Sequence, residues 1–323
     1  MSDADTEISS LPGTIDFVRN PSARETPLPP PPPPEVAAEP DVVLDTSTLR
    51  PIWLCADDYG LSHGVNAAIR DLVVRGRLNA VSVMVVSSAL SRSEARSLSI
   101  LNSGTRRFAI GLHLTLTAPF RPLVQNYSPT ADGQFLSLKE TFRAAFLRRL
   151  KEEKLAVEIA AQMKAFVAIM GRAPDFVDGH QHVHLLPQVR NAVLMVTRQV
   201  APQAWIRQCG RKGSRLRRLG DRKGLVLDML SGKMRRLAAK AGLRTNAAFA
   251  GTYRFDADAD YARLFPGFLR DLPADGLIMC HPGYVDSELQ QLDPLTDLRE
   301  KEHAYLGSDA FPGVLRAAGV TLE

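Results

Sequence analysis

The sequence predicts an α/β fold built on about seven parallel strands that form a closed or nearly closed barrel. Short apolar segments rich in β-branched residues alternate with longer segments of helical spacing along most of the chain. Such alternation is typical of βα units, whose strands pair in parallel. Acidic residues and histidines follow several predicted strands, at the edge of the sheet where parallel α/β proteins carry their chemistry.

The predicted elements run in order from Pro51, where the sequence changes from polar to apolar. A strand over 51–56 ends at two carboxylates, and a helix over 64–76 has its apolar residues at helical spacing. Later strands are expected over 80–86, 108–114, 175–184, 204–207, 245–250 and 277–281, and further helices over 138–150 and 155–170. We therefore expect the side chains that follow these strands to meet at one edge of the sheet.

The composition fits one large α/β domain, since 45% of the 323 residues are hydrophobic. The three cysteines, Cys55, Cys209 and Cys280, form no CxxC pair, so we expect buried, reduced thiols in a cytoplasmic protein. No segment has the length and apolar character of a membrane span, and none has the pattern of a secretory signal.

Residues 1–48 are expected to form a tail outside the catalytic domain, which spans residues 49–323. The tail contains an unbroken proline run over 29–34, which predicts an extended polyproline II spacer. A ligand for an SH3-like domain is the alternative interpretation of this run.

The segment 207–244 is an insertion-like stretch with thirteen Lys or Arg residues and two Asp, a net charge of +11. The rest of the chain carries −6, because the whole chain carries +5. One interpretation is a solvated helix whose apolar residues pack on the barrel. The other is that its cations contact an anionic membrane surface or a phosphorylated carrier; these cations are Arg211, Lys212, Arg215, Arg217 and Arg218. No aromatic residues lie among these cations, so nucleic acid is not expected.

Two adjacent carboxylates, Asp57 and Asp58, follow the first predicted strand. Neighbouring side chains of a strand point in different directions, so one can bind a metal while the other accepts a proton from water. The alternative for an Asp at this position is a helix N-cap. Gly60 indicates a turn that needs backbone freedom.

Single histidines mark two other strand ends. His113 lies within an apolar strand, where it is either a metal ligand or a buried core residue. His281 ends an apolar strand and is followed by Pro-Gly, so it is either a general acid or a turn histidine in solvent.

A third motif contains three alternating histidines, His180, His182 and His184. If the segment is extended, all three share one face, and imidazole is a common metal ligand near neutral pH. This motif favours a metal site. The signatures of several other enzymes are absent, among them HExxH, the P-loop, GxSxG, and HxE with a PCxxC partner.

Together these motifs resemble the YdjC-like carbohydrate deacetylase family, which includes the chitooligosaccharide deacetylase and the hopanoid-biosynthesis-associated deacetylase. The matching segments occur in the family's order, at 56–62, 82–84, 111–114, 178–184 and 279–283. The resemblance implies a distorted (βα) barrel of the polysaccharide-deacetylase type. It also implies that Asp58, His113 and His180 hold one divalent metal ion, Mg²⁺ or Zn²⁺. Two nitrogens and one oxygen suit Zn²⁺ better than Mg²⁺.

The reaction that this resemblance implies is hydrolytic removal of an N-acetyl group from an acetylated amino sugar or oligosaccharide. Asp57 would accept a proton from water, and His281 would protonate the leaving amine. His182 or His184 would orient the substrate. Two alternatives stay open, a metal-dependent hydrolase of another amide or ester, and a metal-binding or sugar-binding module without turnover. A free carboxylate at Asp57 favours an enzyme over a binding module.

Overall fold

The computed structural model describes residues 49–104, 107–212 and 222–322. The predicted tail over 1–48 lies outside the described residues, and so do Arg215, Arg217 and Arg218 of the basic segment.

Seven parallel strands form the central sheet, in the order β8-β7-β4-β3-β2-β10-β9. They are β2 (Trp53–Tyr59), β3 (Ala80–Val83), β4 (Ala109–Leu114), β7 (Phe176–Gly179), β8 (Trp205–Ile206), β9 (Phe249–Ala250) and β10 (Leu277–Cys280). A single parallel bridge between Ile206 and Thr245 brings the two outer segments together. The sheet is therefore a curled, barrel-like sheet, and the predicted α/β barrel of about seven strands is confirmed.

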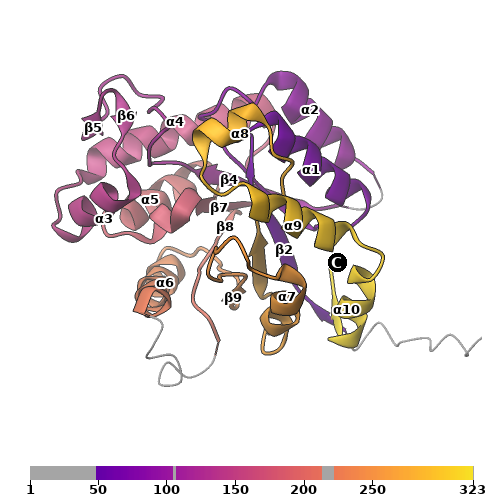
Figure 1. The fold of residues 1–323 in the computed structure, drawn as a ribbon. Coiled ribbons are helices and arrows are strands. Elements are labelled where there is room, and N and C mark those ends of the chain that lie inside the picture. Colours follow the sequence, from indigo (N-terminus) through magenta and orange to yellow (C-terminus); the bar gives the residue numbers. More distant parts are fainter. Residues whose placement is uncertain (1–48, 105–106, 213–221, 323) are drawn as a thin grey trace, which may run out of the picture. The chain divides into compact units, whose positions relative to one another are not determined.

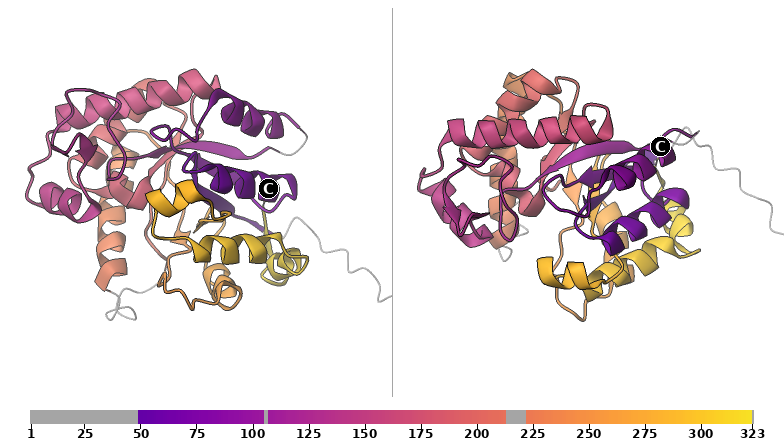
Figure 2. Two further views of the ribbon diagram at one scale, coloured as in Figure 1. Left: turned by 45° about the horizontal axis from the view of Figure 1, so that its top comes forward. Right: turned by 90° about the horizontal axis from the view of Figure 1, so that it is seen from above.

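Helices pack around this curled sheet (Figures 1 and 2). They are α1 (His63–Val74), α2 (Arg92–Leu101), α3 (Leu138–Phe146), α4 (Glu152–Met170), α5 (Val189–Val200), α6 (Arg222–Lys240), α7 (Tyr261–Leu269), α8 (Ser287–Leu292), α9 (Asp297–Gly307) and α10 (Phe311–Ala317). Among the described helices, none is long and apolar enough to cross a membrane. Two small sheets complete the fold: β1 (Arg50–Pro51) pairs in parallel with β11 (Val320–Thr321), and β5 (Thr130–Ala131) forms an antiparallel pair with β6 (Gln134–Phe135).

The turn from β2 into α1 depends on a glycine and a cap. Gly60 has φ +98°, and a Cβ atom there would lie 2.6 Å from the carbonyl oxygen of Met84, so a larger residue does not fit. Ser62 caps α1, because its Oγ accepts a hydrogen bond from the backbone N–H of Val65 at 3.2 Å. The chain can therefore reverse direction directly after Tyr59, which leaves the Asp58 carboxylate next to the end of the strand.

The predicted strand over 175–184 is only partly correct. The strand ends at Gly179, and His180–Leu185 form a 3₁₀ turn. Within this turn Gln181 and His182 have φ values of 54° and 59°, in the left-handed region that few non-glycine residues adopt. The expectation that the three histidines share one strand face is therefore wrong, and each of them points to a different part of the structure.

Candidate active site

The ends of three strands bring Asp57, Asp58, His113 and His180 together. Asp57 and Asp58 belong to β2, His113 belongs to β4, and His180 follows β7 directly. The register of β2 against β3 shifts between Ala56 and Tyr59. Asp58 also has φ 69°. An irregularity of this kind changes the direction in which side chains point. The two adjacent carboxylates are therefore both buried yet contact different partners.

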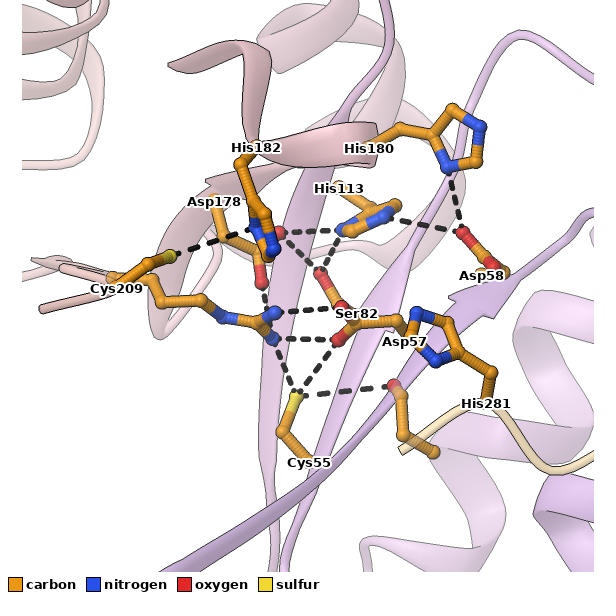
Figure 3. A network of polar contacts seen from close by, with 12 residues as sticks. Cys55, Asp57, Asp58, Ser82, His113, Asp178, His180, His182, Cys209 and His281 are labelled. Carbon is orange, nitrogen blue, oxygen red and sulfur yellow. Dashed lines mark hydrogen bonds and ion pairs between the residues drawn. The ribbon is translucent and has the colours of Figure 1, made fainter. Parts of the chain in front are cut away.

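Asp58 lies between two imidazoles (Figure 3). Its Oδ1 is 2.9 Å from Nδ1 of His180 and 3.2 Å from Nε2 of His113. The three potential ligand atoms all lie within 4.8 Å of one another. Asp58 and His113 are buried, whereas His180 is partly exposed.

A carboxylate and a hydroxyl group hold the far side of the His113 ring. Nδ1 of His113 is 2.7 Å from Oδ1 of Asp178 and 3.0 Å from Oγ of Ser82, and the Ser82 hydroxyl donates to Asp178 at 2.5 Å. Burial by itself lowers the pKa of His113, but the carboxylates of Asp178, Asp57 and Asp58 together outweigh it and raise that pKa to about 10. Metal-binding histidines commonly carry such a carboxylate on their other nitrogen. One carboxylate oxygen and two imidazole nitrogens, oriented in this way, fit a divalent ion.

Asp57 is paired with a buried arginine. Both Asp57 oxygens accept hydrogen bonds of 2.6 Å from the guanidinium of Arg207, which is fully buried and also contacts Asp178 at 2.5 Å and Sγ of Cys55 at 2.9 Å. Burial alone would raise the pKa of Asp57, but Arg207, together with the nearby His113, outweighs burial and lowers it below its ordinary value. Asp57 is therefore ionised at neutral pH.

Arg207 also explains a second cluster of possible metal ligands. Cys55, Asp57 and Asp178 offer ligand atoms within 4.8 Å of one another. The guanidinium contacts all three of these residues, so a cation already balances this cluster. Arg207 was counted with the insertion-like basic segment, and for this residue that interpretation is wrong, because its side chain is part of the barrel interior.

The chain matches the sequence model of the YdjC-like protein family over residues 51–317. It belongs to the YdjC-like family. This confirms the resemblance inferred from the motifs. Among its relatives is the chitooligosaccharide deacetylase of Klebsiella pneumoniae subsp. pneumoniae, 29% identical over 260 residues that cover 75% of this chain and 88% of that protein. The chitooligosaccharide deacetylase of Escherichia fergusonii is 28% identical over 241 residues, which cover 73% and 82% of the two chains.

A crystal structure from Enterococcus faecalis V583, of a protein named for cellobiose-phosphate cleavage, has a similar fold. Its TM-score is 0.64 with 22% sequence identity, and the match covers 85% of this chain and 97% of that one. At this identity the similarity concerns the fold.

In this YdjC-like chain His281 follows β10 and lies near Asp57 (Figure 3). The backbone N–H of His281 donates to Oε2 of the buried Glu302 at 2.6 Å, and the Tyr253 hydroxyl donates to Oε1 of the same carboxylate at 2.7 Å. The imidazole ring is partly exposed and lies edge-on to Phe255, with 5.7 Å between ring centroids. Its position between Asp57 and solvent allows contact with a substrate.

His182 and His184 have partners other than Asp58. His184 is fully buried, and its Nε2 is 2.9 Å from the backbone carbonyl oxygen of Arg207. Nδ1 of His182 is 3.6 Å from Sγ of Cys209. Burial lowers the pKa of His182 to about 3 and that of His184 to about 4, so both rings are neutral near pH 7. The predicted substrate contact does not suit a fully buried His184, whose hydrogen bond holds the backbone of Arg207 instead.

Sequence reasoning missed the roles of five residues. They are Ser82, Asp178, Arg207, Arg299 and Glu302. For Asp178 a signal was present, since it stands two residues before His180 at the end of a predicted strand. Arg207 is the last residue of another predicted strand, and this position was a signal that its side chain is buried at the site. Arg299 and Glu302 come from helix α9 and left no comparable signal.

Proposed function

We propose that this protein is a metal-dependent hydrolase that removes an N-acetyl group from an acetylated amino sugar or oligosaccharide. The observation that carries the proposal is the position of Asp57, an ionised carboxylate next to the cluster of Asp58, His113 and His180. The similarity to chitooligosaccharide deacetylases supports the class of substrate.

The proposed ligands are Asp58, His113 and His180. Two nitrogen donors favour Zn²⁺ or a similar transition ion over Mg²⁺, which prefers oxygen. When bound, such an ion lowers the pKa of water and polarises a carbonyl group.

The proposed roles of the remaining groups follow from their protonation and position. Asp57 accepts the proton of the attacking water, because Arg207 keeps its carboxylate ionised although it is buried. His281 donates a proton to the nitrogen of the leaving amine, and Glu302 fixes the backbone from which its ring projects. The C–N bond of the acetamide breaks, and acetate and a free amino sugar result.

A sugar-binding surface is proposed beside His281. Phe255 is 40% exposed and packs on Tyr253 at 4.4 Å between ring centroids. An exposed aromatic ring next to a proton donor can stack against the apolar face of a sugar ring. Phe255 would then hold the sugar while His281 reaches the acetamide nitrogen.

The test combines metal analysis of purified protein with an acetate-release assay. The substrates are a panel of acetylated amino sugars and oligosaccharides, with acetyl esters and simple amides as comparisons. Acetate release from amino sugars alone supports the proposal. Release from esters alone points to the alternative hydrolase, and stoichiometric metal with no turnover on any substrate points to a binding module.

Peripheral contact with an anionic membrane surface is a further part of the proposal. On α6 the exposed residues from 226 onward are apolar or cationic, among them Val226, Met229, Lys233 and Arg236. The helix's one acidic residue, Asp228, is buried and pairs with Arg211 at 2.9 Å. A helix face of this kind suits an interface that is both negatively charged and partly apolar.

We propose the cytoplasm as the location of the protein, since the three cysteines are free and buried.

A further inference from the structure

The two oxygens of Asp58 have separate partners. Oδ1 faces the two imidazoles, at 3.2 Å from Nε2 of His113 and 2.9 Å from Nδ1 of His180. Oδ2 accepts a hydrogen bond of 2.7 Å from Nη2 of Arg299. Both partners of this ion pair are buried, with 1% of Arg299 exposed. A metal held by the imidazoles therefore meets one oxygen of Asp58, while the other oxygen is engaged by a cation.

Arg299 is fixed on several sides. Its Nη2 also donates to Oδ2 of Asp293 at 2.5 Å, and its Nε donates to the carbonyl oxygen of Leu295 at 3.0 Å. Its own carbonyl oxygen accepts from the backbone N–H of Gly283 at 3.1 Å. A Cβ atom on Gly283 would lie 3.2 Å from Cδ of Arg299, so the loop after His281 packs closely on the arginine stem. These contacts prevent the guanidinium from moving away when Asp58 binds an ion.

We propose that Arg299 is a positioning residue that keeps Asp58 a one-oxygen metal ligand and thereby sets the metal preference of the site. The proposal rests on the metal site of the proposed function. Ions that accept few ligands, such as Zn²⁺, tolerate a one-oxygen carboxylate. Ions that prefer more oxygen ligands, such as Mn²⁺, gain when a carboxylate binds through both oxygens. Removing Arg299 would free Oδ2 and favour the second group of ions.

The test measures the dissociation constants of Zn²⁺ and Mn²⁺ by competition with a chelator of known affinity. The proteins are wild type, R299M and R299K, with R70M as control because Arg70 forms a partly buried ion pair with Glu94 and its partners, Glu94 and Tyr59, are not proposed ligands. Loss of a positive charge strengthens the binding of all divalent ions alike, so it cancels in the ratio of the two constants. The preference for Zn²⁺ over Mn²⁺ should fall by about tenfold or more in R299M, within the usual range for residues that orient ligands. It should persist in R299K, which keeps a cationic donor, and in R70M.

A spectroscopic measurement checks the cause. The visible absorption of bound Co²⁺ weakens as its coordination number rises, so it should weaken in R299M and not in R299K or R70M. An unchanged ratio and an unchanged Co²⁺ spectrum in folded R299M would overturn the proposal. If R299M does not fold, R299Q replaces it and the same ratio decides. Neither measurement needs turnover. If the wild type binds Zn²⁺ but releases no acetate, the proposed deacetylase activity is wrong and this inference can still hold. If the wild type binds neither ion, both the proposed metal site and this inference are wrong.

Discussion

The substitution Arg207→Met tests how the site keeps its base ionised. Arg207 contributes its guanidinium to Asp57 through two bonds of 2.6 Å and to Asp178 through one of 2.5 Å, with no exposed surface. Methionine keeps much of the apolar stem but leaves two buried carboxylates without their shared cation. Breaking one partner out of a buried pair typically lowers stability by about 3–5 kcal/mol. We expect a loss of this size in the free energy of unfolding at pH 7.

The same substitution should change the pH dependence of catalysis. In the wild type, Arg207 is the largest of the charges that oppose burial and hold the pKa of Asp57 below its ordinary value, so the proposed base is ionised throughout the neutral range. In the variant, burial acts without that opposition and raises the pKa of Asp57. The acidic limb of the kcat/KM profile should therefore move to higher pH, and activity lost at pH 6 should be partly recovered at higher pH.

The effect of Arg207→Met on the free energy of unfolding should depend on pH, because the folded and unfolded states bind protons differently. In the wild type the folded pKa of Asp57 is depressed, so its contribution to stability is present above the unfolded value of about 3.9 and is lost only as pH falls through the folded value. In Arg207→Met the folded pKa is raised, so the folded state gains protons first and becomes relatively more stable as pH falls. The stability difference between the two proteins should shrink between pH 7 and pH 5. Urea unfolding at both pH values and a kcat/KM profile measure these effects; an unshifted profile with a stability loss below about 1 kcal/mol would refute the reasoning.

Three other sets of substitutions address the remaining roles. Asp57→Asn should keep fold and metal yet lower turnover by ~10²–10⁴, the usual worth of a general base, and near-wild-type acetate release would exclude Asp57. His113→Ala and His180→Ala should each lose stoichiometric metal and activity, because a three-ligand site cannot easily spare one; elemental analysis that still finds one ion per chain would contradict the ligand assignment. Lys233→Glu combined with Arg236→Glu should reduce co-sedimentation with anionic vesicles, since each cation near such a surface contributes ~1 kcal/mol, whereas equal, negligible binding by both proteins at low and high salt would remove the membrane contact.

The strand ends were predictable because two rules act together. Apolar β-rich segments identify strands, and parallel strands in an α/β fold present their carboxyl ends at one edge. Those rules place Asp58 and His113 correctly, since both belong to strands that the structure contains. The helix over 155–170 was also predicted well, within three residues of α4 (Glu152–Met170). In these segments the local sequence pattern was sufficient, because regular strands and helices alone determine the positions of their side chains.

Local pattern failed where the backbone leaves its usual regions or where distant segments meet. Left-handed φ values at Gln181 and His182 turn the histidine motif out of the strand. The residue types in that motif give no sequence signal for such φ values. Arg299 reaches Asp58 across 241 positions of sequence. An arginine on a helix is usually solvated, so its burial depends on the carboxylates that the completed fold brings to it. Helix α5 (Val189–Val200) was not predicted, although Val189, Val193 and Val196 on it are buried.

The two buried arginines offset the negative charge of the buried carboxylates. Asp57, Asp58 and Asp178 place three carboxylates in the interior, and Arg207 and Arg299 supply two positive charges. The raised pKa of His113, about 10, means that its imidazolium adds a further positive charge at neutral pH. A metal ligand must be a neutral imidazole, so binding an ion through His113 displaces that proton. If His113 is a ligand of the proposed ion, binding releases this proton, and the metal affinity should weaken as pH falls.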